Sequence, residues 1–317
     1  MLTALTFAAA TVVALLVTPL VRGFAHARGL LDQPGGRKVH HVPVPRLGGV
    51  AMAIAFGVGI GLATLADPDL GSTLGLRPNR APALLAGVSL LLVVGIVDDV
   101  RGMRASVKLG FQVGAAVLSW ALGLSIEQLF LPWGTIELGP LSLPVTVAWV
   151  VGVINAINLI DGLDGLAAGV VLTALGAFGL LAAADGVDPT LPIIAATMGA
   201  AVGFLAYNLH PASIIMGDTG SMFLGFVVAA VGVSLTQDGV QPQAPWIPII
   251  ALGVPIVDTI WAVVRRTARG DPLFAPDRGH IHHQLLNGGL SQRDAMLTLT
   301  AISAALAMIA VILGQLE

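Results

Sequence analysis

The chain has 317 residues, of which 56% are hydrophobic and 10% are charged, and its mean hydropathy is +0.90. A soluble domain carries about 25% charged residues, so this composition excludes a soluble protein and indicates a multi-pass α-helical membrane protein. The segment 1–317 is predicted to be one membrane domain, and no nucleic-acid partner is expected. The chain contains no Cys, which excludes disulfide bonds and thiol chemistry.

Ten apolar runs are long enough to cross a bilayer as helices, which takes about 20 residues each. They are 2–21, 47–66, 82–98, 108–124, 144–160, 165–184, 190–207, 219–236, 245–264 and 293–314. The predicted fold class is therefore all-α, a polytopic membrane protein with about ten transmembrane helices. The first run has no basic segment before it, so we expect a retained helix and not a signal peptide. Residues 126–143 are expected to form a short hairpin on the outer surface.

The basic residues are distributed unevenly between the two sides of the membrane. With ten spans, the loops 22–46, 98–108 and 265–293 lie on one side, and they hold all but two of the 15 Lys and Arg residues. The positive-inside rule makes that side cytoplasmic, so both termini should face outward. All seven His residues fall on this same side. We therefore expect a multi-pass protein of the cell (inner) membrane with a polar site on its cytoplasmic face.

A polar stretch interrupts the hydrophobic sequence between the fifth and sixth runs. It contains Asn155, Asn158, Asp161 and Asp164 together with two glycines. A carboxylate at membrane depth costs roughly 3 kcal/mol, so two carboxylates together with two amides indicate a site. The spacing of three places the last three of them on one helix face, although the glycines predict a partly unwound turn. Oxygen ligands of this kind suit Mg²⁺; capping of helix ends is the alternative, and it needs only one such residue.

Two further acidic motifs lie on the cytoplasmic side. Asp98 and Asp99 close the third run, and adjacent carboxylates need a cation or a shared proton, so they could bind metal, act as a general base, or form a solvated helix end. Asp218 opens the eighth run, where it could bind metal beside a helix N-terminus that also favours phosphate, or serve as the N-cap. Lys108 could hold a phosphate as a point charge.

Two loops combine basic residues with histidine. Arg278, His280, His282 and His283 lie in the longest cytoplasmic loop. Clustered histidines can bind a transition metal, but the absence of Cys makes zinc the weaker interpretation, compared with binding to phosphate and sugar hydroxyls; a solvated loop remains an alternative. Arg46 belongs to a basic loop held extended by prolines. That loop could line an anionic lipid head group or act only as a topology signal.

These signals gain weight because they share one face of the membrane. Acidic metal ligands, a lysine and Arg/His loops suit phosphoryl transfer on a membrane-embedded substrate, in which Mg²⁺ neutralises charge and a carboxylate acts on the nucleophile. A cation-coupled transporter is the alternative from another class, since intramembrane acids also mark transporters. Transporter sites lie near the midplane of the bilayer, whereas these acids cluster at one face.

The order of the motifs resembles the polyprenyl-phosphate N-acetylhexosamine-1-phosphate transferases of the WecA/TagO type (glycosyltransferase family 4), relatives of phospho-MurNAc-pentapeptide translocase. The resemblance runs from about Asp32 to His283. It is carried by Arg37-Lys38-x-His40, Pro45-Arg46-x-Gly48-Gly49, Asp98-Asp99 with Lys108 and Gln112, Asn155-x-x-Asn158-x-x-Asp161-Gly162-x-Asp164-Gly165, Asn208, Gly217-Asp218-x-Gly220-Ser221, Asp258 with Arg265-Arg266, and His280-x-His282-His283.

The resemblance implies transfer of N-acetylglucosamine-1-phosphate from UDP-N-acetylglucosamine to undecaprenyl phosphate or another polyprenyl phosphate. UMP would be released in this first lipid-linked step of a cell-envelope glycopolymer such as lipopolysaccharide or teichoic acid. Another UDP-N-acetylhexosamine and UDP-MurNAc-pentapeptide are the alternative donors. The spacing His280-x-His282-His283 resembles the N-acetylglucosamine branch more than the translocase, which tends to three successive histidines. Mg²⁺ is the implied cofactor, with Mn²⁺ as a substitute, and a homodimer is compatible with the resemblance.

The resemblance also implies a role for individual residues. Asp218 should be the main Mg²⁺ ligand with Asn158 close by, Asp98 should act on the lipid phosphate as base or orienter, and Asp99 should support the metal site. The residues expected to contact substrate are Arg46, Lys108, Asn155, Asp161, Asp164, Arg278, His280, His282 and His283.

These substrate contacts divide between the two ends of the donor. Lys108 should hold phosphate, Asp161 and Asp164 should lie at the nucleoside end, and the loop from Arg278 to His283 should touch the diphosphate and the sugar. The family often has Phe three residues before the metal-binding Asp, where it stacks on uracil. This chain has Ile215 at that position, so the sequence does not show which residue stacks on the base.

Overall fold

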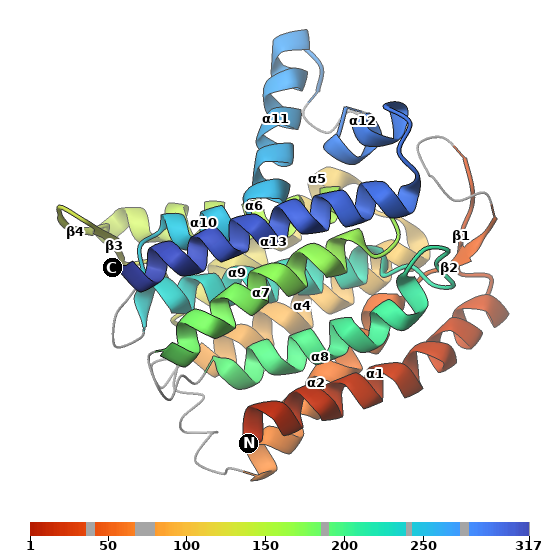
Figure 1. Ribbon diagram of the computed structural model, residues 1–317, viewed down its shortest axis with the longest axis horizontal. Coiled ribbons are helices and arrows are strands. Elements are labelled where there is room, and N and C mark those ends of the chain that lie inside the picture. Colours follow the sequence, from red (N-terminus) through yellow and green to blue (C-terminus); the bar gives the residue numbers. More distant parts are fainter. Residues whose placement is uncertain (36–41, 67–79, 185–189, 239–242, 273–278, 317) are drawn as a thin grey trace.

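The computed structural model describes residues 1–35, 42–66, 80–184, 190–238, 243–272 and 279–316. These residues form a bundle of long helices with two small two-stranded sheets (Figure 1). In chain order the elements are α1 (Leu2–Ala27), β1 (Leu31–Asp32), β2 (Val44–Pro45), α2 (Gly48–Ala66), α4 (Arg80–Arg101), α5 (Ala105–Ala121), β3 (Gln128–Leu131), β4 (Gly134–Glu137), the 3-10 turn η1 (Gly139–Leu141), α6 (Ser142–Ile160), α7 (Leu166–Ala184), α8 (Leu191–Asn208), α9 (Gly217–Gln237), α10 (Trp246–Ala251), α11 (Gly253–Arg269), α12 (Ile281–Asn287) and α13 (Gln292–Leu316).

The long helices confirm the predicted all-α membrane fold. Eight of them, in the described part of the chain, are long and apolar enough to cross a membrane: α1, α2, α4, α6 with η1, α7, α8, α9 and α13. Helix α5, with 17 residues, falls just below that length. Nine of the ten predicted runs therefore correspond to one continuous helix each. The number of spans and the side on which the termini lie stay predictions.

The run at 245–264 was expected to be one helix, and this expectation is wrong. The chain forms α10 and α11 with a break at Leu252, and α11 leaves the bundle at a steep angle to the other helices (Figure 1). Pro255 explains the break, because it has no N–H to donate to the carbonyl four residues earlier and is tolerated only in the first turn of a helix. Exposed Trp261 and Ile260 on α11 are suited to contact with lipid.

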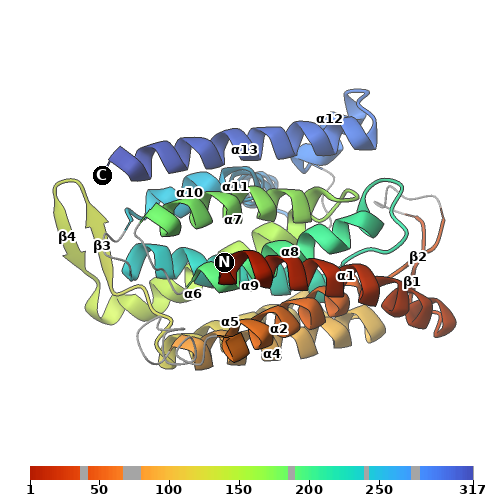
Figure 2. The same ribbon diagram turned by 60° about the horizontal axis from the view of Figure 1, so that its bottom comes forward.

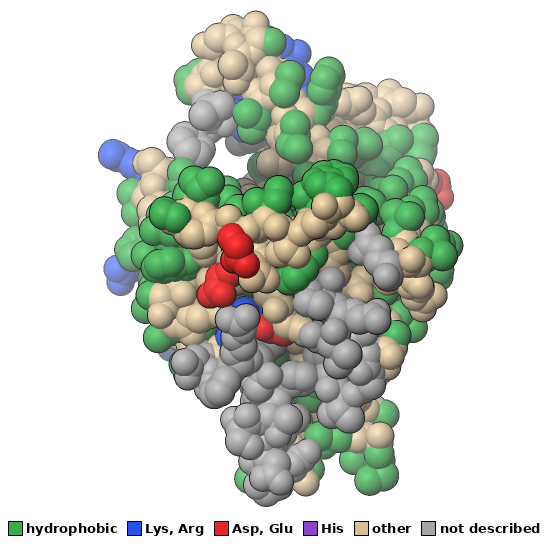
Figure 3. Space-filling view, turned by 90° about the vertical axis from the view of Figure 1, so that its left-hand side faces the viewer, with side chains coloured by type: hydrophobic (Ala, Val, Ile, Leu, Met, Phe, Trp, Pro, Cys, Tyr) green, Lys and Arg blue, Asp and Glu red, His purple; other side chains and the backbone are tan. Residues whose placement is uncertain are grey.

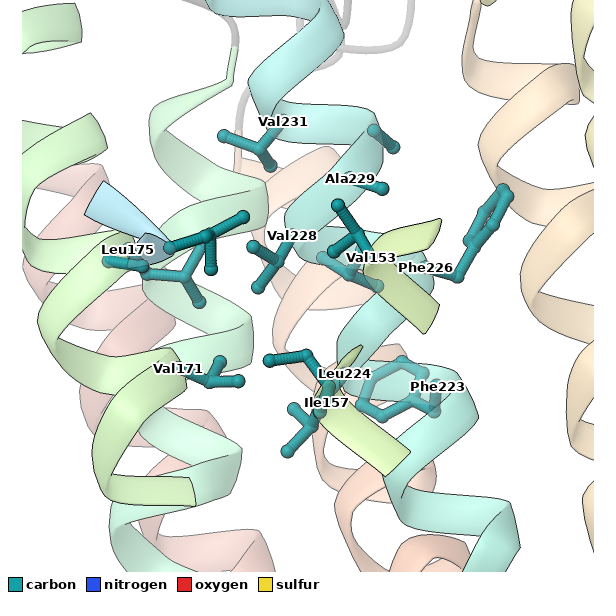
Figure 4. Packing of buried hydrophobic residues seen from close by; sticks show 14 of the residues in the cluster. Val153, Ile157, Val171, Leu175, Phe223, Leu224, Phe226, Val228, Ala229 and Val231 are labelled. Atoms are coloured by element: carbon teal, nitrogen blue, oxygen red, sulfur yellow. The ribbon is translucent and has the colours of Figure 1, made fainter. Parts of the chain in front are cut away.

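Helix α9 lies at the centre of the bundle, and its residues 219–236 are all buried. It packs against α6, α4, α2 and α7, and Figure 2 shows it between α7 on one side and α4 with α5 on the other. In Figure 4, Val171 of α7 and Ile157 of α6 both approach Leu224 of α9. Because α9 has no exposed face, its position is fixed by its neighbours and by the polar contacts at its two ends.

Helix α4 holds α9 at both of those ends. At the start of α9, the Asp99 carboxylate of α4 accepts hydrogen bonds from the backbone N–H groups of Asp218 (2.9 Å) and Thr219 (3.0 Å). At the far end, fully buried Arg80 of α4 forms an ion pair with Asp238, the C-cap of α9. An acid at a helix N-terminus and a base at its C-terminus both complement the helix dipole.

A β-hairpin closes the end of the bundle that lies opposite the start of α9. Strands β3 and β4 pair antiparallel with Leu129 opposite Ile136, which confirms the hairpin expected in 126–143. The C-terminus lies beside this hairpin in Figures 1 and 2. Figure 3 views the bundle from this end and shows a group of acidic side chains near the middle of the face, with hydrophobic side chains above and beside it. The acidic residues singled out in the sequence as site candidates lie at the other end, where α9 begins.

The Arg80–Asp238 pair yields a prediction about stability. Arg80→Met should destabilise the protein by about 3 kcal/mol, because it leaves a partly buried carboxylate without its cation. The double variant Arg80→Met/Asp238→Leu should recover most of this loss, since both charges are then absent. Thermal unfolding of the purified variants measures the difference. Equal melting temperatures for the single and double variants would show that the pair does not hold the end of α9.

Candidate active site

A polar cavity of about 220 Å³ lies at the end of the bundle where α9 begins. It forms where the ends of α4 and α6 meet the start of α9 and the strand pair β1–β2. Its walls are made by Asp32, Arg46, Asp99, Asn158, Asp161, Ile215, Gly217 and Asp218. Five of the predicted site residues are therefore brought to one cavity from four separate parts of the sequence.

Lys108 links two of the acids beside this cavity. Its Nζ lies 2.5 Å from Asp98 Oδ2 and 2.8 Å from Asp218 Oδ1. Asn158 Nδ2 donates to the same Asp218 oxygen at 2.6 Å and to Ser221 Oγ at 2.7 Å. Lys108 of α5, Asn158 of α6 and Asp218 of α9 thus form one hydrogen-bonded network. The sequence predicted each of these three residues, and it gave no separate signal for Ser221.

Asp98 is joined to this network through Lys108 and does not line the cavity. Its Oδ1 accepts a hydrogen bond from the backbone N–H of Met103 at 2.6 Å, while its Oδ2 contacts Lys108. The carboxylate is buried and is therefore fixed between the turn that follows α4 and the amine of Lys108. This geometry suits a residue that orients Lys108.

Asp99 has a structural task that the sequence did not reveal. Besides the two backbone bonds to the start of α9, its Oδ2 accepts a hydrogen bond from Thr219 Oγ1 at 2.6 Å. Gly217, with φ +68°, passes so close that a Cβ there would lie 2.5 Å from Asp99 Oδ2. Gly95, one turn earlier on α4, allows the same close approach to Thr219. Both oxygens of Asp99 accept hydrogen bonds from this helix end, so Asp99 caps α9. Asp99 also lines the cavity, and its expected support of the metal site stays a prediction.

Asp161 provides a carboxylate without a hydrogen-bond donor among the described residues. It follows the last residue of α6 and lies in the turn 161–165, which confirms the partly unwound turn expected there. Burial, followed by the negative charges of Asp218, Asp99 and Asp164, raises its pKa well above the usual value for an aspartate. A cation in the cavity would relieve this repulsion and let the carboxylate ionise.

Two of the predicted substrate residues make contacts within the protein, one between loops and one between helices. Asp164 Oδ2 contacts His210 Nδ1 at 2.9 Å and accepts the N–H of Ala212 at 3.0 Å, which ties the α6–α7 turn to the α8–α9 loop. Asn155 Nδ2 donates to Gln112 Oε1 of α5 at 2.7 Å, one helical turn away from Asn158. Neither residue lines the cavity.

Arg46 lies at the rim of the cavity, where it forms an ion pair with Asp32. Leu31 and Asp32 pair with Val44 and Pro45 as β1–β2, which sets this ion pair in place. The same segment binds the loop before α9, since Ile215 N–H donates to the Pro45 carbonyl at 3.0 Å. Ile215 lines the cavity at the position where the family often has Phe. The sequence noted Asp32 only as the start of the resemblance.

The described part of the histidine-containing segment, residues 279–283, is called the histidine loop. It lies over the α6–α7 turn. His280 Nδ1 contacts Asp258 Oδ2 at 2.8 Å, and Asp258 Oδ1 accepts the N–H of Ile281 at 2.9 Å, so α11 holds the start of α12. His282 packs directly on Gly162, where a Cβ would lie 2.3 Å from His282 Nε2. His283 contacts the ring of His282 at a centroid distance of 4.3 Å. The histidines therefore stand beside the turn that carries Asp161.

Arg278, which the sequence also assigns to this loop, lies outside the described residues, as do Arg37, Lys38 and His40.

The fold and the cavity together define an integral membrane protein with an acidic, lysine-containing site at one end of its helical bundle. The family model for glycosyl transferase family 4 matches residues 81–236. The chain is 39% identical over 301 residues to a probable undecaprenyl-phosphate N-acetylglucosaminyl 1-phosphate transferase of Bacillus subtilis, covering 94% of this chain and 81% of the relative.

Two other relatives are similar over most of their length. A decaprenyl-phosphate N-acetylglucosaminephosphotransferase of Mycobacterium tuberculosis is 34% identical, with 91% of this chain and 76% of the relative covered. An undecaprenyl-phosphate alpha-N-acetylglucosaminyl 1-phosphate transferase of Haemophilus influenzae is 32% identical, with 95% and 84% covered. The chain belongs to this family, the polyprenyl-phosphate N-acetylhexosamine-1-phosphate transferases within glycosyl transferase family 4.

The capping role of Asp99 can be separated from a role in chemistry. Asp99→Asn should lower stability by about 1–3 kcal/mol, because an amide replaces one acceptor oxygen and leaves N–H or O–H donors of α9 unpaired. Asp218→Asn should change stability by less, since Lys108 keeps Asp98 as a partner, yet it should abolish turnover. Thermal unfolding and turnover of both variants measure the contrast. An Asp99→Asn protein with wild-type stability would contradict the capping role.

His282 should make the stability depend on pH. Burial, followed by the neighbouring His283, lowers its pKa from 6.5 to about 4. Between these values the unfolded chain binds the proton and the folded chain does not, so stability falls as the pH drops, by at most about 1.4 kcal/mol per pH unit. The stability that neutral His282 contributes is fully present above the pKa of this residue in the unfolded chain. It is lost as the pH falls through the pKa of His282 in the folded protein.

The control for this effect is His282→Gln, which cannot titrate. Melting temperatures of both proteins should be compared between about pH 7 and pH 4.5, and the variant should lose less stability than the wild type over this window. Parallel curves for the two proteins would mean that His282 is not buried in its neutral form.

Proposed function

We propose that this protein transfers N-acetylglucosamine-1-phosphate from UDP-N-acetylglucosamine to undecaprenyl phosphate, or a related polyprenyl phosphate, and releases UMP. This would be the first lipid-linked step of a cell-envelope glycopolymer. The observation that carries the proposal is the network of Lys108, Asp218 and Asn158 beside a cavity that also contains Asp161. The names and similarity of the relatives support the same activity.

The reaction is an exchange of one phosphoanhydride bond for another. An oxygen of the lipid phosphate attacks the phosphorus atom that carries the sugar, and the bond between that phosphorus and the bridging oxygen breaks. UMP leaves with the bridging oxygen and its electron pair, and the sugar phosphate is now joined to the lipid phosphate. Catalysis of such a transfer depends mainly on positioning and on stabilisation of charge.

We further propose that Mg²⁺, or Mn²⁺ in its place, binds in the cavity. Asp218 and Asp161 would supply carboxylate oxygens, with the Asn158 amide beside them. The raised pKa and missing hydrogen-bond donor of Asp161 fit a site that needs a cation. The described residues hold no group of three or more His, Asp or Glu placed to bind a metal, so substrate oxygens and water would complete the coordination, as Mg²⁺ prefers. The bound ion would neutralise charge on the diphosphate.

Lys108 and Asp98 would serve the lipid phosphate. Lys108 is a compact cation already balanced between Asp98 and Asp218, and it can turn toward a phosphate as a point charge. A phosphomonoester has its second pKa near about 6, so the nucleophile is mostly ionised at neutral pH and needs little proton removal. Asp98 would therefore act mainly by orienting Lys108.

The sugar and diphosphate would lie between the cavity and the histidine loop. His282 and His283 stand beside the Asp161 turn, and Arg46 stands at the rim. Their donors suit phosphate and hydroxyl oxygens. The distribution of basic residues favours the cytoplasmic side of the inner membrane for this end. Ten spans, with α5 and the broken α10–α11 segment counted, would then place both termini outside.

UMP release tests the proposed function. Purified protein should be assayed with undecaprenyl phosphate, Mg²⁺ and a panel of UDP-sugars that contains UDP-N-acetylglucosamine, UDP-N-acetylgalactosamine and UDP-MurNAc-pentapeptide. We expect UMP only when both substrates are present, and most of it with UDP-N-acetylglucosamine. A preference for another donor would change the substrate, and uptake of cations without UMP release would favour the transporter.

Asp98→Asn tests the chemical step. A positioned acid–base group contributes about 10²–10⁴-fold, and loss of the charge that orients Lys108 should lower kcat by a factor near the lower end of that range. The KM for the UDP-sugar should change little, because Asp98 does not line the cavity. An unchanged kcat with a raised KM for the lipid would assign Asp98 to binding alone.

A further inference from the structure

A second cavity lies at the end of the bundle opposite the acidic site. Its volume is about 250 Å³, and its walls come from β3, α6, the last two turns of α9, and the segment that contains α10. Most wall atoms are carbon, from residues such as Leu129, Val145, Trp149 and Val233. Trp149 Nε1 donates to the Ala229 carbonyl at 3.0 Å, so the polar atom of this side chain is satisfied. An apolar cavity of this kind stays dry and takes up apolar guests.

The hairpin forms a fixed wall of this second cavity. Gln237, at the end of α9, accepts the backbone N–H groups of Glu127 (2.9 Å) and Gln128 (3.1 Å) through Oε1 and donates through Nε2 to the Gln128 carbonyl (2.9 Å). Strand β3 is thereby fastened to α9. Ile249 also belongs to the wall and is 45% exposed, so the cavity borders the outer surface of the bundle, where lipid would lie.

The distance between the two cavities limits what can reach both. Asp218 and Gly232 are separated by fourteen residues of α9 and Thr236 lies four further on, which corresponds to about 21–27 Å along the helix. The hydrocarbon core of a bilayer is about 30 Å thick, so one leaflet supplies about 15 Å. A phospholipid with its head group at the acidic site is too short to reach the second cavity. A polyprenyl chain, which exceeds the thickness of a leaflet several-fold, is long enough.

We propose that the second cavity binds the distal isoprene units of the polyprenyl phosphate acceptor while its phosphate lies at Lys108. This inference rests on the proposed function and adds a site that makes the enzyme sensitive to acceptor chain length. Carbon-lined walls match the branched hydrocarbon of the chain end. The fastened hairpin gives the cavity a rigid wall against which that end can stop.

The test compares a long acceptor with a short one. Undecaprenyl phosphate can reach the second cavity, and farnesyl phosphate cannot. Val145→Trp places a large ring in the cavity and should lower kcat/KM for undecaprenyl phosphate about tenfold, equivalent to about 1.4 kcal/mol, with little change for farnesyl phosphate. Ala148→Trp, an exposed position on the same helix that is not part of the wall, is the matched control and should leave the ratio of the two kcat/KM values unchanged.

Each outcome decides a separate question. If the wild type transfers sugar phosphate to neither acceptor, the proposed function fails. If the wild type is active and Val145→Trp leaves the ratio of the two acceptors unchanged, the second cavity does not bind the chain end, and bulk lipid fills it. An equal effect of Ala148→Trp on the ratio would also overturn the inference.

A second measurement avoids dependence on any variant. Undecaprenyl phosphate with a photoreactive diazirine on its terminal isoprene unit should cross-link the wild-type protein to peptides that contain Trp149 or Ile249. Excess unlabelled undecaprenyl phosphate should suppress these cross-links, and excess phospholipid should not. Cross-links confined to α1 or α13 would place the chain end elsewhere and contradict the inference.

Discussion

The architecture of the site depends on which group accepts hydrogen bonds from the first N–H groups of α9 inside an apolar bundle. The first N–H groups of a helix have no partner within the helix, and α9 begins among buried neighbours. Asp99 accepts two of these groups, and Gly95 and Gly217 allow the close approach that this requires. Asp218 directly follows Gly217, so this cap fixes the position of the central acid of the site, and the Arg80–Asp238 pair fixes the far end.

The charges around Asp218 balance one another only in part. Lys108 is shared by Asp98 and Asp218, and Asp164 is engaged by His210, but Asp161 faces the cavity without a donor in the described chain. Burial and the neighbouring negative charges raise the pKa of Asp161, and a nearby cation would favour its ionised form. Contacts outside the cavity also position the site. Asp258 of α11 accepts the N–H of Ile281, and His282 packs on Gly162, so the histidine loop is held beside Asp161. The resulting arrangement suits a substrate that brings a cation and a diphosphate together.

Much of this could be predicted from the sequence, because long apolar runs and clustered polar residues leave strong signals. Nine runs form single helices, and the hairpin and the 161–165 turn were expected. The break before Pro255 was missed, because hydropathy alone does not register a missing backbone donor. The structural contacts of Asp99, Asn155 and Asp164 were also missed, because a sequence does not show which distant helix or loop a side chain contacts. Ser221 and Asp32 were noted only as parts of the resemblance, and their contacts with Asn158 and Arg46 follow from the packing of separate elements.

The central claim is that Asp218 and Asp161 hold one divalent cation. Mn²⁺ binding to the purified protein, followed by electron paramagnetic resonance, tests it most directly. We expect one Mn²⁺ per chain, with affinity reduced at least about tenfold in Asp218→Asn and in Asp161→Asn, since each removes a charged ligand. Asp164→Asn should retain wild-type affinity, because Asp164 contacts His210 and does not line the cavity. Equal affinity in the wild type and the Asp218→Asn variant would contradict the account.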